Sequence, residues 1–100
     1  MRKLVPTLLL MILPIAARAQ VFESLIGHKL CFDSGHTSLF LPNGEYVEDG
    51  KRMGSWAHIA GDTIDWSSNR TGRGPVEFTR QGESIVVIFA GRTRSAKVCK

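Results

Sequence analysis

The chain has 100 residues, with 13 Lys and Arg against 9 Asp and Glu, which gives a formal net charge of +4. That length allows one small domain at most. Three of the basic residues, Arg2, Lys3 and Arg18, lie in the first 19 residues, so the other 81 carry a net charge of only +1. Such a near-neutral chain lacks the concentrated basic surface of a nucleic-acid-binding protein, and we expect no nucleic-acid partner.

Residues 1–19 have the pattern of a signal peptide. Arg2 and Lys3 form a positive start, residues 4–15 are almost all apolar, and Ala17 and Ala19 place small side chains before a cleavage site. A transmembrane anchor is the alternative, but this apolar run is shorter than the roughly 20 residues that span a bilayer. We therefore expect a secreted or periplasmic domain of residues 20–100, without an integral membrane segment after cleavage.

The mature chain begins with apolar residues at helical spacing and continues with strand signals. Residues 21–26 read V-F-E-S-L-I before Gly27, which predicts one or two turns of helix, with an irregular apolar segment as the alternative. From His28 onward, turn signals recur every eight to twelve residues, which is typical of an all-β fold. The runs between them predict strands at residues 28–33, 37–41, 45–48, 51–59, 63–67, 76–79, 84–90 and 93–99.

No segment between these strands is long enough for a helical crossover, so the strands should be antiparallel. We therefore expect a meander of about eight short strands that forms a small closed or clam-like barrel. Cys31 and Cys99 are the two cysteines, and in an oxidising compartment they should form one disulfide between the first and last strands. A redox-active or metal-binding pair is the alternative, but the Cys-x-x-Cys spacing is missing.

Three turn signals set the register of the hairpins. Asn43-Gly44 and Asp49-Gly50 favour two-residue type I′ turns, and Gly61-Asp62 favours type II′. Loops of two residues would pair Leu41 with Tyr46, Glu48 with Lys51, Tyr46 with Met53, Ile59 with Ile64, and Ala57 with Trp66. Because strand side chains alternate between faces, this register predicts a core face of Leu39, Leu41, Tyr46, Met53, Ala57, Ile59, Ile64 and Trp66.

The same register places Phe40, Val47 and Trp56 together on the opposite face, where three apolar side chains need an explanation. A β-bulge at Ala57-His58 would turn Trp56 back into the core. The segment of residues 21–26 would otherwise cover the three side chains. The third explanation is an exposed patch that binds a partner.

The polar residues favour structural roles over catalysis. Asp33, Ser34 and His36 fall within one turn, where a hydrogen-bonded turn is the simpler interpretation than a catalytic triad. The three histidines lack metal-ligand spacing. We therefore predict no catalytic residues, no metal site and no cofactor.

Two basic stretches near the end of the chain are open to two interpretations. Arg70 and Arg73 lie in a Gly-rich loop, and Arg92 and Arg94 lie near the C-terminus. The two stretches either converge into a surface for an anion or polysaccharide, or form a solvated charged rim. The candidate partner surface therefore comprises Phe40, Val47, Trp56, Arg70 and Arg73.

Between Phe40 and Trp66 the motifs P-N-G-E, D-G-K, G-S-W and G-D-T-I-D-W follow one another. This succession resembles small secreted bacterial β-meander domains of uncharacterised, lipocalin-like families. The resemblance implies a barrel architecture rather than an activity. Because the chain is shorter than a typical lipocalin and lacks that family's G-x-W on the first strand, we expect no ligand cavity.

These observations predict a non-enzymatic binding or interaction module of the cell envelope, which we expect to be monomeric. An envelope protein or a polysaccharide is the expected partner. The alternative is an inhibitor of an extracellular or periplasmic hydrolase that acts through the loop of residues 69–75. Small periplasmic lysozyme inhibitors resemble the chain loosely in size, disulfide and barrel form.

The signal-peptide pattern predicts a mature chain that begins at Gln20. The intact mass of the exported protein measures this directly. An exported product that retains residues 1–19 would contradict the prediction.

Overall fold

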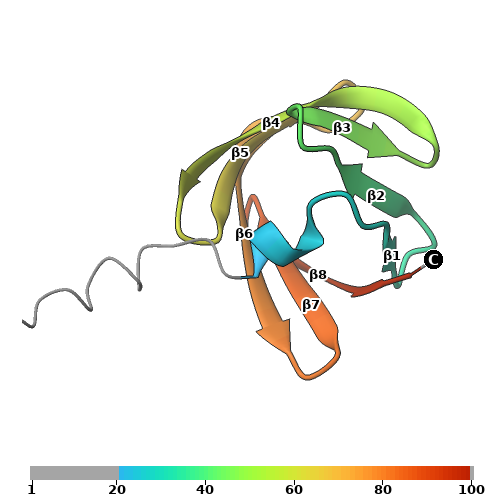
Figure 1. The fold of residues 1–100 in the computed structure, drawn as a ribbon, viewed down its shortest axis with the longest axis vertical. Coiled ribbons are helices and arrows are strands. Elements are labelled where there is room, and N and C mark those ends of the chain that lie inside the picture. The colour runs from blue at the N-terminus through green and yellow to red at the C-terminus, as the bar shows by residue number, and fades with distance from the viewer. Residues whose placement is uncertain (1–20, 100) are drawn as a thin grey trace, which may run out of the picture.

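Residues 21–99 are described in a computed structural model, where eight antiparallel strands close into a barrel. Each strand pairs with the next in sequence, and the last pairs with the first (Figure 1). The predicted fold class is therefore confirmed, while the predicted signal peptide lies outside the described residues. The strands are β1 (Leu30–Phe32), β2 (Thr37–Phe40), β3 (Glu45–Glu48), β4 (Lys51–Ala60), β5 (Thr63–Ser68), β6 (Gly72–Gln81), β7 (Ser84–Phe89) and β8 (Arg92–Val98).

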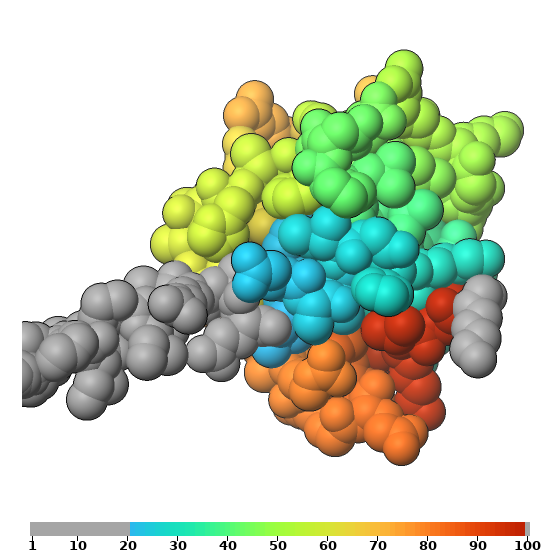
Figure 2. All heavy atoms as spheres, in the orientation of Figure 1, coloured from blue at the N-terminus to red at the C-terminus, as the bar shows by residue number. Residues whose placement is uncertain are grey.

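A short 3-10 helix, Phe22–Leu25, closes one end of the barrel. Phe22 is 1% exposed and its ring lies 5.0 Å from that of Trp56, centroid to centroid. The Asp62 carboxylate accepts hydrogen bonds from the backbone N–H groups of Val21 (2.8 Å) and Phe22 (3.0 Å), which fixes the start of the helix to the β4–β5 turn. Figure 2 shows residues 21–30, in blue and cyan, across the centre of this face of the molecule.

No helix within residues 21–99 has the length and apolar character needed to cross a membrane.

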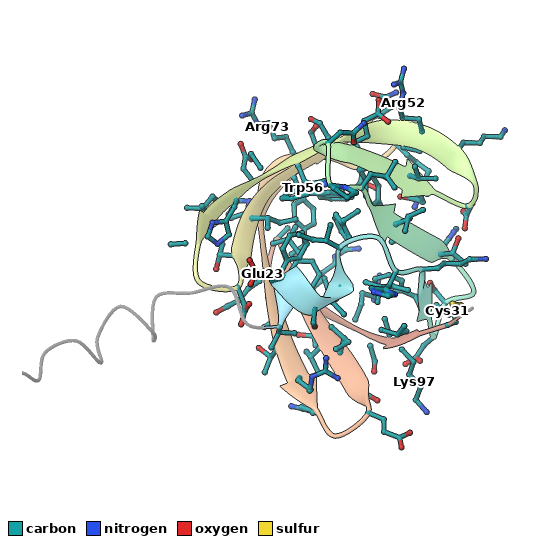
Figure 3. The ribbon with its side chains drawn as sticks, in the orientation of Figure 1. Glu23, Cys31, Arg52, Trp56, Arg73 and Lys97 are labelled. Atoms are coloured by element: carbon teal, nitrogen blue, oxygen red, sulfur yellow. A yellow bond between two sulfur atoms is a disulfide. The ribbon has the colours of Figure 1, made fainter. Side chains whose placement is uncertain are left out.

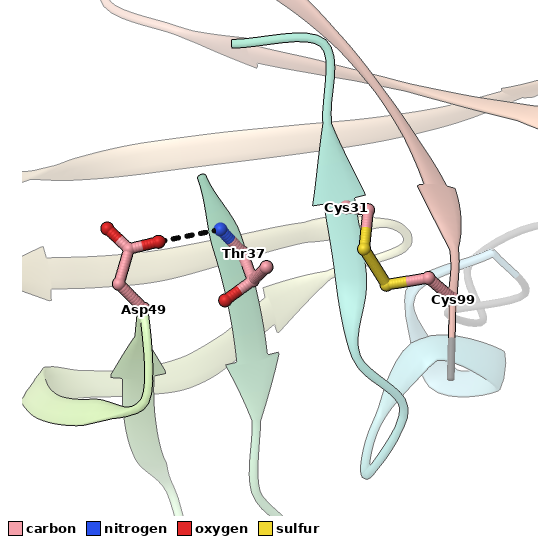
Figure 4. Close-up of a disulfide and its surroundings, with 4 residues drawn as sticks. All are labelled: Cys31, Thr37, Asp49 and Cys99. Carbon is pink, nitrogen blue, oxygen red and sulfur yellow. Dashed lines mark hydrogen bonds between the residues drawn. A yellow bond between two sulfur atoms is a disulfide. The ribbon is translucent and has the colours of Figure 1, made fainter. Parts of the chain in front are cut away.

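The barrel is closed by the shortest strand and by the disulfide. β1 pairs with β2 on one side and with β8 on the other, where Cys31 lies opposite Lys97. The predicted Cys31–Cys99 bond is confirmed; its Cα atoms are 5.8 Å apart, and it joins residues 68 positions apart in sequence (Figure 4). The bond therefore fastens the one strand pair that brings the two ends of the meander together.

Two hairpin turns differ in how well their sequence signals predict them. Asp49-Gly50 is a two-residue turn, as expected, because Glu48 pairs with Lys51 and both turn residues have positive φ (51° and 83°). The β2–β3 loop instead has three residues, 42–44, and Phe40 rather than Leu41 lies opposite Tyr46. Pro42 fits the second position of a type I turn, and Gly44, at φ 93°, completes the loop with a hydrogen bond from its N–H to the Leu41 carbonyl (3.0 Å).

Two irregularities in β4 shift the register further. The pairing with β3 skips Met53, and the pairing with β5 skips Ile59, which is 55% exposed. The two-residue loop Gly61-Asp62 is confirmed, but the predicted pair of Ile59 with Ile64 is wrong, because His58 lies opposite Ile64. The expected bulge at Ala57-His58 is thus found one position later, and it turns Trp56 inward opposite Trp66.

These register changes correct the predicted core. Tyr46, Ile64 and Trp66 are buried as expected, and Met53 is half-buried against the core. Phe40, predicted on the opposite face, is only 4% exposed, because a shift of one residue moves a side chain to the other face of the sheet. The predicted core residues that lie outside the core are Leu39, Leu41, Ala57 and Ile59.

We predict that reduction of the disulfide, or Cys31→Ala, lowers the melting temperature by well over about 10 °C. A closed loop of this length restricts the unfolded chain by about 4 kcal/mol, and a domain of this size changes by several degrees per kcal/mol. A thermal scan with and without reductant measures the shift. An unchanged midpoint, or free thiols in the native protein, would contradict the stabilising role of the bond.

Candidate functional site

The end of the barrel opposite the 3-10 helix opens into a cavity of about 690 Å³, which corrects the expectation that no ligand cavity exists. The turns β1–β2, β5–β6 and β7–β8 and the end of β3 surround its mouth and contribute lining residues such as Ser34, Thr71, Ala90 and Glu48. Pockets that hold small ligands in proteins have volumes of roughly 300–1,000 Å³. The cavity is therefore the strongest candidate for a binding site in the described part of the chain.

One wall of the cavity is apolar and comes from β5, β6 and β7. The Trp66 ring lies edge-to-face against Phe89, with centroids 5.0 Å apart. Gly74 makes this contact possible, because a Cβ atom at that position would lie 3.1 Å from Phe89 Cε1. The other apolar side chains of this wall are Val76, Phe78 and Val87, all buried.

The facing wall is polar and comes from β2 and β3. The Tyr46 hydroxyl donates to Glu48 Oε1 at 2.8 Å. Because the phenol has one hydrogen to give, the Ser38 hydroxyl must donate to Tyr46, over 2.9 Å. Arg70, from the β5–β6 turn, binds the second oxygen of Glu48 through Nε (2.7 Å) and Nη2. This chain of bonds neutralises Glu48, a carboxylate that is only 5% exposed.

Burial of Tyr46 raises the pKa of its hydroxyl well above the ordinary value of 10.0. The nearby Glu48 carboxylate raises this pKa further, since it accepts the phenol hydrogen and repels a tyrosinate charge. Tyr46 therefore stays a neutral hydrogen-bond donor throughout the neutral pH range.

The Trp66 side chain carries the one buried polar side-chain atom that lacks a hydrogen-bond partner among the described residues, its indole Nε1. An unpaired buried donor costs roughly 1–3 kcal/mol of stability. Edge-to-face packing holds the ring in this position between Phe89 and Tyr46, whose centroid is 5.3 Å away. The unpaired Trp66 indole N–H in the wall of the cavity thus lowers the stability of the fold.

A hydrogen-bonded pair of side chains, His36 and Asp49, lies beside the mouth. His36 Nδ1 is 2.7 Å from Asp49 Oδ2, and Asp49 Oδ1 accepts the backbone N–H of Thr37 at 2.9 Å (Figure 4). The bond from Thr37, followed by the one from His36, lowers the pKa of Asp49. His36 therefore bonds to Asp49 and not to Ser34, which leaves the predicted turn without the hydrogen bonds of a triad.

His36, Glu48 and Asp49 also form a group in which a possible ligand atom from each lies within 4.8 Å of the others. Sequence spacing did not predict this convergence, because the three residues come from two different turns. However, Glu48 is already bonded to Tyr46 and Arg70. The group is best described as part of the polar wall and its rim.

The five residues of the predicted partner surface do not come together. Phe40 is buried, Trp56 lies inside the ring of strands and donates its indole N–H to the Leu41 carbonyl (2.9 Å), and Val47 is half-buried on the outer face of β3. Arg70 is bonded to Glu48 at the cavity, whereas Arg73 is bonded to Asp65 outside it (2.7 Å; Figure 3). A role of any of them in binding stays a prediction.

The candidate surface predicted from the sequence did not include two arginines that lie at the mouth of the cavity. Arg92 and Arg94 line the cavity together with Arg70, so the two basic stretches do converge in part. The signal was present in the alternation of β8, since Ala96 is buried and residues two and four positions before it share its face. What the sequence could not tell is that this face points into a cavity.

We predict that Tyr46, the single tyrosine of the chain, does not ionise in the folded protein at the pH where free tyrosine does. Because the raised pKa belongs to the folded state, its stabilising effect is complete below the unfolded pKa and is lost as the pH rises beyond it. Ultraviolet titration of tyrosinate, with and without denaturant, measures the difference, and Tyr46→Phe is the blank. Tyrosinate formation at the ordinary pH in folded protein would contradict the buried network.

No protein-family model matches the chain, and neither a curated protein nor a solved structure shows detectable similarity to it. Of the resemblance to lipocalin-like domains, the barrel architecture is present in the structure. Membership of such a family stays a prediction.

Proposed function

We propose that the protein is a non-enzymatic binding module of the cell envelope, secreted or periplasmic, that holds a small organic molecule in the open end of its barrel. The observation that supports this most is the cavity itself, with one apolar and one polar wall. Binding sites for small molecules commonly combine a mainly apolar lining with a few placed polar groups.

The scaffold supports binding because the walls of the cavity are tied together. Eight strands, a covalent bond between β1 and the C-terminal end, and a 3-10 helix at the far end hold the walls in place. A preformed site loses little conformational entropy when a ligand enters it.

Export is supported by the leader pattern and by the disulfide, which is the kind of bond that persists in oxidising compartments. A non-enzymatic role is supported by the way the polar groups of the cavity are used. The Ser38 hydroxyl donates to Tyr46 rather than to a base, and the Tyr46 hydroxyl donates to Glu48. These groups hold one another and are not arranged around a reacting atom.

The alternative, an inhibitor acting through residues 69–75, has less support. Both arginines of that loop are bonded to acidic residues of the same chain, Arg70 to Glu48 and Arg73 to Asp65. An envelope protein or a polysaccharide as partner stays a prediction.

We predict that the neutral fluorescent probe N-phenylnaphthylamine binds saturably to one site. Val87→Trp should weaken this binding by about tenfold or more, because Val87 lines the cavity and a larger side chain would fill it. Fluorescence titration of the folded, oxidised protein measures both.

The matched control is Val86→Trp, on the outer face of the same strand, which should bind the probe as the unchanged protein does. Val76→Phe, at a second lining position, guards against an effect of one variant on folding. Absence of saturable binding, or equal weakening by the inner and outer variants, would contradict the proposed function.

A further inference from the structure

The inward face of β8 carries two arginines at the mouth of the cavity. Ala96 is 1% exposed and points into the barrel, and Arg94 and Arg92 lie two and four residues before it on the same strand. Both side chains line the cavity, and their strand is separated from β2 of the polar wall by β1 alone. Their position follows from the regular pairing of β8 with β7, which runs without a bulge from Phe89–Arg92 to Ile85–Ala96.

The charges that line the cavity do not balance. Arg70 is matched by Glu48, to which it is bonded. Arg92 and Arg94 have no ion-pair partner among residues 21–99. The nearby Asp49 carboxylate is bonded to His36 and to the backbone N–H of Thr37, and neither Asp49 nor the exposed Asp33 lines the cavity. The mouth therefore holds two positive charges that no acidic side chain of residues 21–99 compensates.

The hydrogen-bond donors of the cavity also favour a ligand with negative charge or acceptor atoms. The hydroxyl hydrogens of Ser38 and Tyr46 and the guanidinium of Arg70 are all directed along the chain of bonds that ends at Glu48. The donors without an acceptor in the described chain include the guanidinium groups of Arg92 and Arg94, the hydroxyls of Ser34 and Thr71, which can also accept, and, deeper and out of contact with water, the indole N–H of Trp66. A ligand that offers acceptors therefore suits this cavity better than one that offers donors.

We propose that the ligand is an organic anion with a flat apolar body, whose anionic group binds Arg92 and Arg94 at the mouth while its body lies against the aromatic wall. This inference rests on the proposed function and names the class of its ligand. Planar guanidinium groups bind carboxylate, sulfonate and phosphate oxygens with two parallel hydrogen bonds. The edge-to-face rings of Trp66 and Phe89 offer an apolar surface to a flat body.

The test compares two probes of nearly the same body that differ in charge. Anilinonaphthalenesulfonate carries a sulfonate, and N-phenylnaphthylamine lacks it. We expect the double variant Arg92→Gln/Arg94→Gln to bind the sulfonate probe about tenfold more weakly or worse, and to bind the neutral probe with an unchanged dissociation constant. Raising the salt concentration should weaken the sulfonate probe alone in the unchanged protein, a measurement that needs no variant.

The matched control is Lys29→Gln/Lys97→Gln, which removes the same charge from exposed positions outside the cavity; Lys97 points away from the barrel in Figure 3. It should leave both probes unaffected. Saturable binding of the neutral probe with no effect of the arginine changes on the sulfonate probe would overturn the ligand class and leave the proposed function intact. Equal weakening of both probes, or equal weakening by the lysine control, would also overturn it. Failure of both probes to bind would remove the proposed function itself.

Discussion

Closure of the meander by β1 is the constraint on which the rest of this structure depends. β1 has three residues, yet it must pair with β2 on one side and with β8 on the other. Few backbone hydrogen bonds can form along so short a strand, and without them both edges of an eight-stranded sheet would be open to other chains. The bond between Cys31 and Cys99 joins the two ends of the sheet at this point. A covalent link thus secures a strand pair whose register covers only three positions.

Once the barrel is closed, its interior must be filled or left hollow. Eight strands enclose a space that side chains can just fill or that holds one small ligand. Here the two halves differ. At one end Phe22 and Leu25 enter from outside the sheet and complete an aromatic core with Phe40, Trp56 and Phe78. At the other end no segment of residues 21–99 enters, and the polar wall of Ser38, Tyr46 and Glu48 faces the apolar one across the cavity. The N-terminal segment therefore determines which end of the barrel is open.

The sequence was sufficient for the strands, the barrel class and the disulfide, because these depend on local turn chemistry and on two cysteines with one possible pairing. It was insufficient for the faces of β2 and β4. The loop at Pro42-Asn43-Gly44 fits both a two-residue and a three-residue hairpin, and only the position of Pro42 favours the longer one. The irregularities at Met53 and Ile59 each move the following side chains by one position, and neither residue type signals a bulge.

Gly54 marks a point where β4 packs closely against β5, but its role is clear only from the structure. A Cβ atom there would collide with the Ser67 backbone, so the strands can approach at this point only with glycine. The cavity was not predictable in the same way, since its lining comes from strands and turns that are far apart in sequence. Convergence of Arg70, Arg92 and Arg94 needs the closed ring of strands, which turn chemistry alone does not arrange.

The polar wall explains why two arginines rather than three are available at the mouth. Glu48 is almost fully buried, and a buried carboxylate without a cation would destabilise the fold. Arg70, whose side chain is about half exposed, supplies that cation from the β5–β6 turn. Its charge therefore belongs to the fold, whereas those of Arg92 and Arg94 are not required by any acidic residue in the described chain. Arg92 and Arg94 are exposed and lie on the inward face of one strand, so their charges are available to a ligand in the cavity.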